Sequence, residues 1–153
     1  MKLRAALVVA AALALGVAGC TDDKVKEANQ YVNAVNKAQG EFASTSNQLV
    51  GEISPTSSRK HDDAVLKRFY AAVDTFVSQL RAIKPPKAVR ALHAKLTSAL
   101  VRFGDSLRSA GADLTSKNAG RILDGQSALA LATQQVSKSI NTTVAKINAA
   151  LKT

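Results

Sequence analysis

The chain has 153 residues, enough for one domain, and carries 21 lysines and arginines against 11 acidic residues, a formal charge of +10. Aromatic residues make up only 4% and tryptophan is absent, which favours helices over strands, because strands prefer β-branched and aromatic side chains. A single cysteine excludes an intramolecular disulfide.

The first 19 residues have the three parts of a secretory signal. Residues 1–4 are short and positive, residues 5–17 are uncharged and almost wholly apolar, and small residues continue to Cys20. The apolar run is shorter than the roughly 20 residues of a membrane span. We therefore expect residues 1–19 to be removed and residues 20–153 to form the mature domain, whose charge is +8 after the loss of two cations.

Val17-Ala18-Gly19-Cys20 resembles the lipobox of bacterial lipoproteins, an aliphatic residue and two small residues before a cysteine. The resemblance covers only the first part of the chain, but it includes the one cysteine. It implies that the Cys20 thiol receives a diacylglyceryl group, since two or three acyl chains anchor a protein stably and one does so only marginally. The expected location is the outer side of a cell membrane. An ordinary signal with an incidental thiol is the alternative, and Thr21 leaves the choice between inner and outer membrane open.

Apolar residues recur at three- and four-residue steps in four segments of the mature chain, which predicts four amphipathic helices. The first segment spans residues 25–53, after two aspartates that suit a helix N-terminus. A gap at residues 51–61 contains the loop 54–58. The second segment, residues 66–83, follows Asp62 and Asp63 and is expected to end before two prolines.

The third segment spans residues 89–114, and the fourth spans residues 122–151. The gap between them, residues 115–120, offers Ser116 or Asn118 as the N-cap of the last helix. Short links force neighbouring helices to run in opposite directions, so the fold class predicted is all-α, an antiparallel up-down-up-down four-helix bundle. Helices of about 22–32 residues give a bundle about 35–45 Å long. A three-helix packing with the fourth helix elsewhere is the alternative.

No residue pattern indicates catalysis, a metal or a cofactor, so neither an enzyme nor a cofactor is expected. His61 is expected to be solvated in a basic stretch, and His93, beside Leu92, to be a surface or boundary residue. Bundle haem sites use His or Met ligands on facing helices, and Met1 leaves with the signal. Five polar residues interrupt the apolar stripes, and we consider a small ligand cavity as their role. They are Gln39, Ser46, Gln126, Thr133 and Thr143.

Four cations flank the two prolines, and no acidic residue occurs between Asp74 and Asp105. These cations are Arg81, Lys84, Lys87 and Arg90. If the first helix starts near Cys20, the turn that carries them returns to the anchored end, where we expect contact with anionic headgroups, each cation contributing about 1 kcal/mol. An ordinary solvated turn is the alternative.

The leading expectation is a non-enzymatic envelope lipoprotein whose bundle binds or supports a partner through the end far from the anchor. The expected partners are the membrane, through the lipid anchor, an anionic lipid or wall polymer, and an envelope protein of unknown identity. Export argues against nucleic acid, the usual partner of a basic protein. A small-ligand binding bundle is the alternative function, and a haem or metal protein is a less favoured one.

Overall fold

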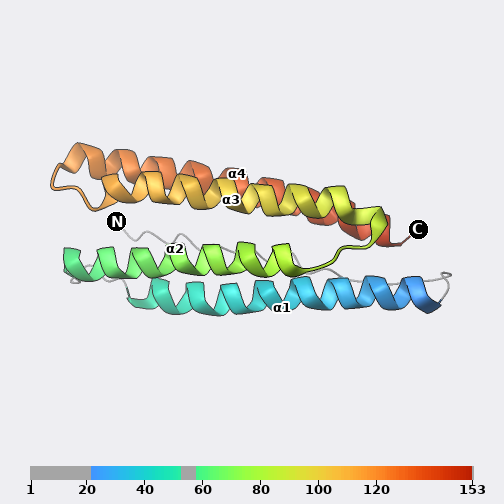
Figure 1. The fold of residues 1–153 in the computed structure, drawn as a ribbon. Helices are drawn as coiled ribbons and strands as arrows, with labels where there is room; N and C mark the ends of the chain where they lie inside the picture. The colour runs from blue at the N-terminus through green and yellow to red at the C-terminus, as the bar shows by residue number, and fades with distance from the viewer. Residues whose placement is uncertain (1–21, 53–57, 153) are drawn as a thin grey trace.

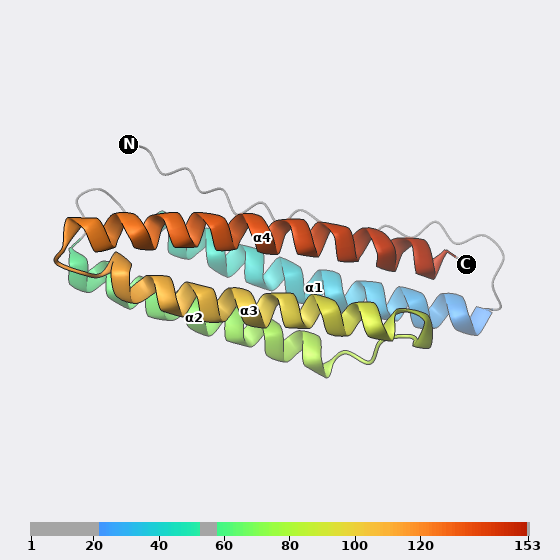
Figure 2. The same cartoon turned by 90° about the horizontal axis from the view of Figure 1, so that it is seen from above.

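The computed structural model describes residues 22–52 and 58–152. The elements are α1 (Asp22–Glu52), α2 (Arg59–Ala82), the short 3-10 helix η1 (Lys87–Val89), α3 (Arg90–Leu114) and α4 (Ala119–Leu151). The four long helices form two antiparallel hairpins, α1–α2 and α3–α4, stacked as two layers (Figures 1 and 2). The predicted antiparallel four-helix bundle is confirmed.

Helix α4 packs along α3 in the most extensive helix–helix contact of the bundle. At Gly125 of α4, a Cβ atom would stand 2.9 Å from the amide nitrogen of Leu114 and 3.0 Å from the carbonyl oxygen of Ala110. Glycine is needed here because both atoms belong to the α3 backbone, which has no room to give. The alternative in which the fourth helix lies away from the other three is therefore wrong.

The helix ends follow local capping chemistry. The Ser58 side chain accepts a hydrogen bond from the His61 amide at 3.3 Å, so α2 begins at Arg59, earlier than the predicted gap allowed. Asn118 caps α4 by accepting from the amides of Gly120 and Arg121 at 2.8 and 3.3 Å, which decides between the two predicted caps. The predicted end of the second helix before the prolines is confirmed, since α2 stops at Ala82.

The core is a continuous cluster of apolar side chains from all four helices and η1. Its largest wholly buried members are Leu80, Leu107, Ile147, Val73 and Val89. Phe42 stacks on Phe76 with ring centroids 4.9 Å apart, as expected for core residues on facing stripes. Every member of the cluster lies between Ala28 and Leu151, so a chain that starts at Thr21 keeps the entire core.

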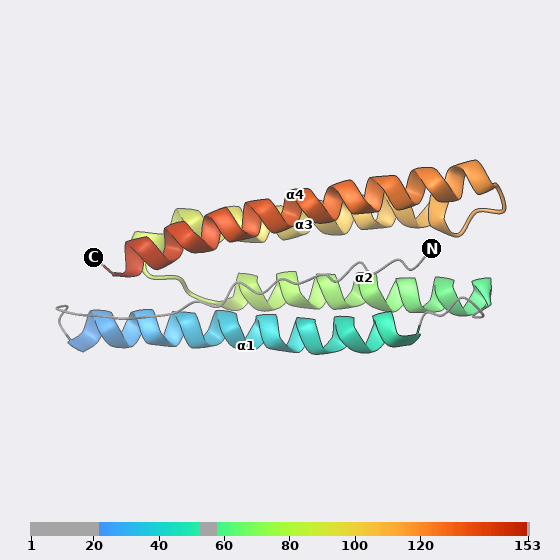
Figure 3. The ribbon, with the colours of Figure 1, turned by 180° about the vertical axis from the view of Figure 1, so that it is seen from behind.

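The start of α1, the α2–α3 connection and the end of α4 lie at one end of the bundle (Figures 1 and 3). We name this the basic end. The end of α1, the start of α2 and the α3–α4 connection lie at the other end, which we name the far end. The predicted signal segment, Cys20 and most of the loop at 54–58 lie outside the described residues. No helix within residues 22–52 and 58–152 is long and apolar enough to cross a membrane.

Candidate anion-binding groove at the basic end

The four cations predicted to contact a membrane are all exposed at the basic end, and we refer to them as the basic-end cations. Arg81 belongs to the last turn of α2, Lys84 to the connection, Lys87 to η1 and Arg90 to the start of α3. None of them forms an ion pair with any residue that the structure describes. The tight proline turn thus brings the four together, while their contact with a membrane stays a prediction.

An open groove of about 570 Å³ lies between the end of α2 and the first half of α3. We name it the arginine groove. Its polar lining is Arg81, Arg90, His93, Thr97, Ser98 and Arg102. Its apolar lining is Ile83, Pro85, Ala94 and Val101. No carboxylate of the described residues lines the groove, and the two connection lysines lie outside it.

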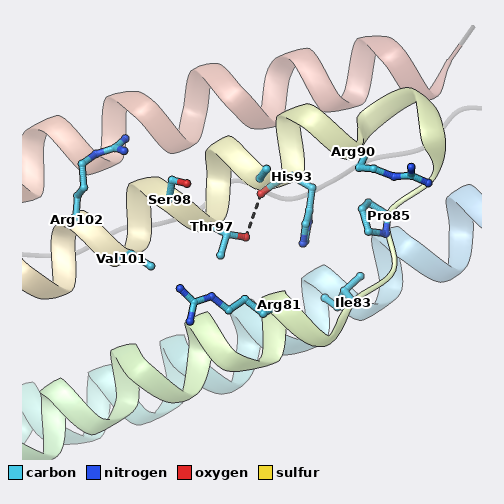
Figure 4. Close-up of a pocket in the computed structure, with 10 residues that line it drawn as sticks. Arg81, Ile83, Pro85, Arg90, His93, Thr97, Ser98, Val101 and Arg102 are labelled. Carbon is cyan, nitrogen blue, oxygen red and sulfur yellow. Dashed lines mark hydrogen bonds between the residues drawn. The ribbon is translucent and has the colours of Figure 1, made fainter.

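Figure 4 shows how the three arginines lie around this groove. The Arg81 side chain extends from α2 toward Thr97 and Val101 of α3, so its guanidinium group lies centrally. Arg90 lies beside Pro85 at the connection, and Arg102 lies at the opposite end of the lining with its side chain directed away from Arg81, toward α4. Arg102 is twelve positions after Arg90, a distance of about 18 Å along the helix. The groove is therefore elongated along the bundle, and Arg81 is the arginine whose side chain reaches its middle.

His93 forms part of the groove wall and is buried, with 7% of its surface exposed. Its Nε2 atom lies 3.0 Å from the Leu80 carbonyl oxygen, and its Nδ1 atom lies 3.1 Å from the Tyr31 hydroxyl. A carbonyl oxygen only accepts, so Nε2 carries the proton and Nδ1 accepts from Tyr31. The imidazole thus joins α1, α2 and α3. The predicted surface or boundary position of His93 is wrong, because both ring nitrogens find partners that allow the ring to be buried.

Burial also determines the protonation states of His93 and Tyr31. It lowers the pKa of His93, against the opposite effect of the hydrogen bond to the Leu80 carbonyl. It raises the pKa of Tyr31 to about 12. Both side chains are therefore neutral at neutral pH, and their hydrogen bonds hold three helices together without moving a proton.

His61 is exposed, in agreement with the expected solvated position, but it lies in the first turn of α2 and not in a loop. Its Nε2 atom is 3.1 Å from the carbonyl oxygen of Glu52 at the end of α1. The two histidines thus lie at opposite ends of the bundle. No group of three or more His, Cys, Asp or Glu side chains within the described ranges could hold a metal ion.

The five polar stripe residues predicted to line a cavity belong to α1 and α4. Ser46 and Thr143 are buried, and Gln39, Gln126 and Thr133 are half-buried. None of the five lines the arginine groove or the second groove, of about 350 Å³, which lies between α1 and α2. Their role in ligand binding stays a prediction.

Sequence reasoning did not single out Thr97, Ser98 and Arg102. The sequence spacing did indicate one shared face of α3, because Arg90, Ala94, Thr97 and Val101 recur at three- and four-residue steps. The contribution of Arg81 to the same groove was not accessible in this way, because it comes from another helix.

Fold and site together define a four-helix bundle with an arginine-lined groove at the end where α1 begins. Comparison of the chain with protein-family models, with curated proteins and with solved structures gave no match. The functional proposal therefore rests on the residues of this chain alone.

Proposed function

We propose that the mature protein is an envelope lipoprotein, anchored through acyl chains on Cys20, whose bundle is a non-enzymatic interaction module with its basic end against an anionic membrane. One observation carries the proposal. Helix α1 begins at Asp22, two positions after Cys20, and this start lies at the same end of the bundle as the acid-free α2–α3 connection. An anchor at Cys20 would therefore hold the basic-end cations near the lipid with no rearrangement of the helices.

Charge supports this orientation. Each lysine or arginine near an anionic leaflet contributes about 1 kcal/mol, and the contribution falls off within a Debye length of about 8–10 Å. The basic-end cations are exposed and have no acidic partner among the described residues, so their charge is available to a surface. Lys146 and Lys152, near the end of α4, add two exposed cations toward the same end.

The large apolar side chains that are exposed among the described residues lie on α1 and α4. Val50 at the end of α1 and Leu123 at the start of α4 are 55% and 63% exposed, and both belong to the far end. Leu131, further along α4, is 55% exposed. Exposed apolar side chains that are scattered singly are common on protein surfaces, so the partner at the far end follows from the proposed orientation and not from an apolar patch.

The anchor is tested by feeding cells labelled palmitate. The wild type should incorporate the label and Cys20→Ala should not, because only the thiol accepts the diacylglyceryl group. Thr21→Ala, which changes the next residue and keeps the thiol, serves as the control and should be labelled. An unlabelled wild type, or a labelled Cys20→Ala, would contradict the proposal.

The orientation is tested by sedimentation of the chain from Thr21 with vesicles of phosphatidylcholine, with and without phosphatidylglycerol. Binding should require phosphatidylglycerol and should be lost when the four basic-end cations are changed to glutamate. A control reverses three exposed cations of the far end, Arg59, Lys60 and Lys117, and leaves the Arg121–Asp113 ion pair intact. Equal loss of binding in both variants, or equal binding to both kinds of vesicle, would exclude an oriented contact.

A further inference from the structure

We infer that the arginine groove is a binding site for a phosphate ester, with Arg81 of α2, whose side chain crosses the groove, as the ligand of the phosphate group. The proposal goes beyond a charged end that rests on lipid, since it assigns a defined site on the side of the bundle. Phosphate esters are supplied by phospholipid headgroups or by soluble molecules. The phosphate chemistry rests on the groove alone, and only the lipid source rests on the proposed function.

The cations of the groove are exposed guanidinium groups without an acidic partner among the described residues. All three cations that line the groove are arginines, while Lys84 and Lys87 lie on the same connection outside it. The planar guanidinium fork donates paired hydrogen bonds to phosphate oxygens, whereas a lysine acts as a point charge. None of the three arginines has an ion-pair partner among residues 22–52 and 58–152, so their donors face solvent. A phosphate group would replace water at the Arg81 donors and neutralise the charge of that guanidinium group.

The apolar part of the lining indicates what accompanies the phosphate. Ile83, Pro85, Ala94 and Val101 line the same space as the arginines. An inorganic phosphate ion would use the arginines alone, whereas a glycerophospholipid would also cover apolar surface. The groove begins at the α2–α3 connection, at the end that the proposed anchor holds against the membrane. A membrane phospholipid is therefore the source that fits both the lining and the location.

Hydrogen bonds of His93 hold the wall of the arginine groove in place. His93 lines the groove, and both of its ring nitrogens are used by Leu80 and Tyr31. The Thr97 hydroxyl donates to the His93 carbonyl oxygen at 3.0 Å (Figure 4). The His93–Leu80 hydrogen bond holds the end of α2 and the start of α3 at a set separation, and the Thr97 bond lies within α3. A wall held in this way binds a ligand without first losing conformational entropy.

The test uses the chain from Thr21, which keeps the whole core, and measures binding by calorimetry and NMR. The probes are a short-chain soluble phosphatidylglycerol, glycerol phosphate, and the vesicles described above. Saturable binding of the soluble phosphatidylglycerol is expected. Arg81→Ala should weaken it roughly tenfold or more, because hydrogen bonds to a charged group are lost. Arg81→Lys should also weaken it, since the charge remains and the fork is lost.

Lys84→Ala is the matched control for the soluble probes, because it removes one exposed charge from the same connection outside the groove and should change the affinity for soluble phosphatidylglycerol by less than about twofold. Arg102→Ala should weaken binding less than Arg81→Ala, because Arg102 lies about 18 Å along α3 from the connection and its side chain is directed away from Arg81. Circular dichroism verifies that each variant remains helical. Equal loss in Lys84→Ala and Arg81→Ala would overturn the site, since it would show diffuse surface charge only.

The remaining outcomes separate this inference from the proposed function. If no soluble probe binds while phosphatidylglycerol vesicles still do, the groove is excluded and the membrane contact stands. If glycerol phosphate binds as tightly as the soluble lipid and depends on Arg81, the site is supported with a soluble ester as its ligand. If palmitate labelling fails but Arg81-dependent binding persists, the lipoprotein proposal falls and the phosphate site is supported.

Discussion

The basic end and the far end of the bundle differ in what their charged side chains contact. Away from the basic end, cations have acidic partners within the protein, among them Arg68 with Glu52 at 2.6 Å and Arg121 with Asp113 at 2.7 Å. Arg108 of α3 pairs with Asp74 of α2. At the basic end the four cations form no ion pair with a described residue, although the start of α1 at the same end carries Asp23 and Glu27. The far end pairs part of its charge internally, whereas the four basic-end cations present theirs to external anions.

The two ends also differ in how their helices are held together. At the basic end Leu80, Val89 and Ile147 are 0% exposed, and the His93 hydrogen bonds add a polar contact across three helices. Toward the far end, contact depends on glycines: Tyr70 of α2 packs directly on Gly111 of α3, and Gly125 lies against the α3 backbone. Side-chain burial therefore stabilises both ends, since Leu49 and Leu107 toward the far end are 2% exposed, while the His93 hydrogen bonds are particular to the basic end and close backbone approach to the far end.

The largest expected effect compares a buried leucine at the basic end with an exposed leucine at the far end. Leu80→Ala at the basic end should lower the free energy of unfolding by about 2–5 kcal/mol, because it leaves a cavity in a fully buried position. Leu123→Ala at the far end, 63% exposed, should change it by less than about 0.5 kcal/mol. Urea unfolding measures both values. Equal losses would mean that Leu123 is buried in solution.

A second prediction compares two glycines. Gly125→Ala should destabilise the bundle by about 1–3 kcal/mol, because the new methyl group meets the α3 backbone and forces the helices apart. At Gly40, on an exposed face of α1, no atom lies within 4 Å of an added Cβ. Gly40→Ala should therefore stabilise the protein by about 0.5–1 kcal/mol through helix propensity. Thermal and urea unfolding measure the two shifts, and a stabilising Gly125→Ala would show that the α3–α4 contact is looser than described.

The smallest expected effect concerns pH and the basic end. Burial lowers the pKa of His93, so the unfolded chain takes up a proton while the folded protein still holds a neutral ring. The stability that this group contributes is complete above the ordinary histidine pKa of about 6.5 and is lost as the pH falls through it toward the lower pKa of the folded state. His93→Gln keeps a donor and an acceptor but does not titrate. Its stability should fall less steeply than that of the wild type between about pH 7 and pH 5, measured by urea unfolding; parallel profiles would exclude His93 as the titrating group.

Several structural features were predictable from the residues alone. The stripe positions Phe42, Phe76 and Leu107 are buried, because the three- and four-residue steps identify the face of a helix that must pack inward. Asn118 was a predicted cap, because a side-chain oxygen at that place satisfies free amides at the start of a helix. The start of α2 was missed because Ser58 extends the helix through cap chemistry outside the apolar stripe.

The site was predictable only in part. Arg81 and Arg90 were identified from the acid-free turn, and their exposure at one end of the bundle follows from its short length. The burial of His93 was not predictable, because it depends on Tyr31, 62 positions earlier, and on a carbonyl of another helix. Periodicity reports which face of a helix is apolar and does not report which polar atoms meet across helices.

The sequence by itself therefore determined the four helices, their alternating directions and the concentration of positive charge at one turn, since each depends on neighbours within a few residues along the chain. Only the tertiary structure decided that α4 packs along α3, that His93 joins three helices, and that arginines from α2 and α3 line one groove. These features depend on the distance and rotation between helices. Both are set by packing between residues far apart in the chain, such as Gly125 against Ala110 and Leu114.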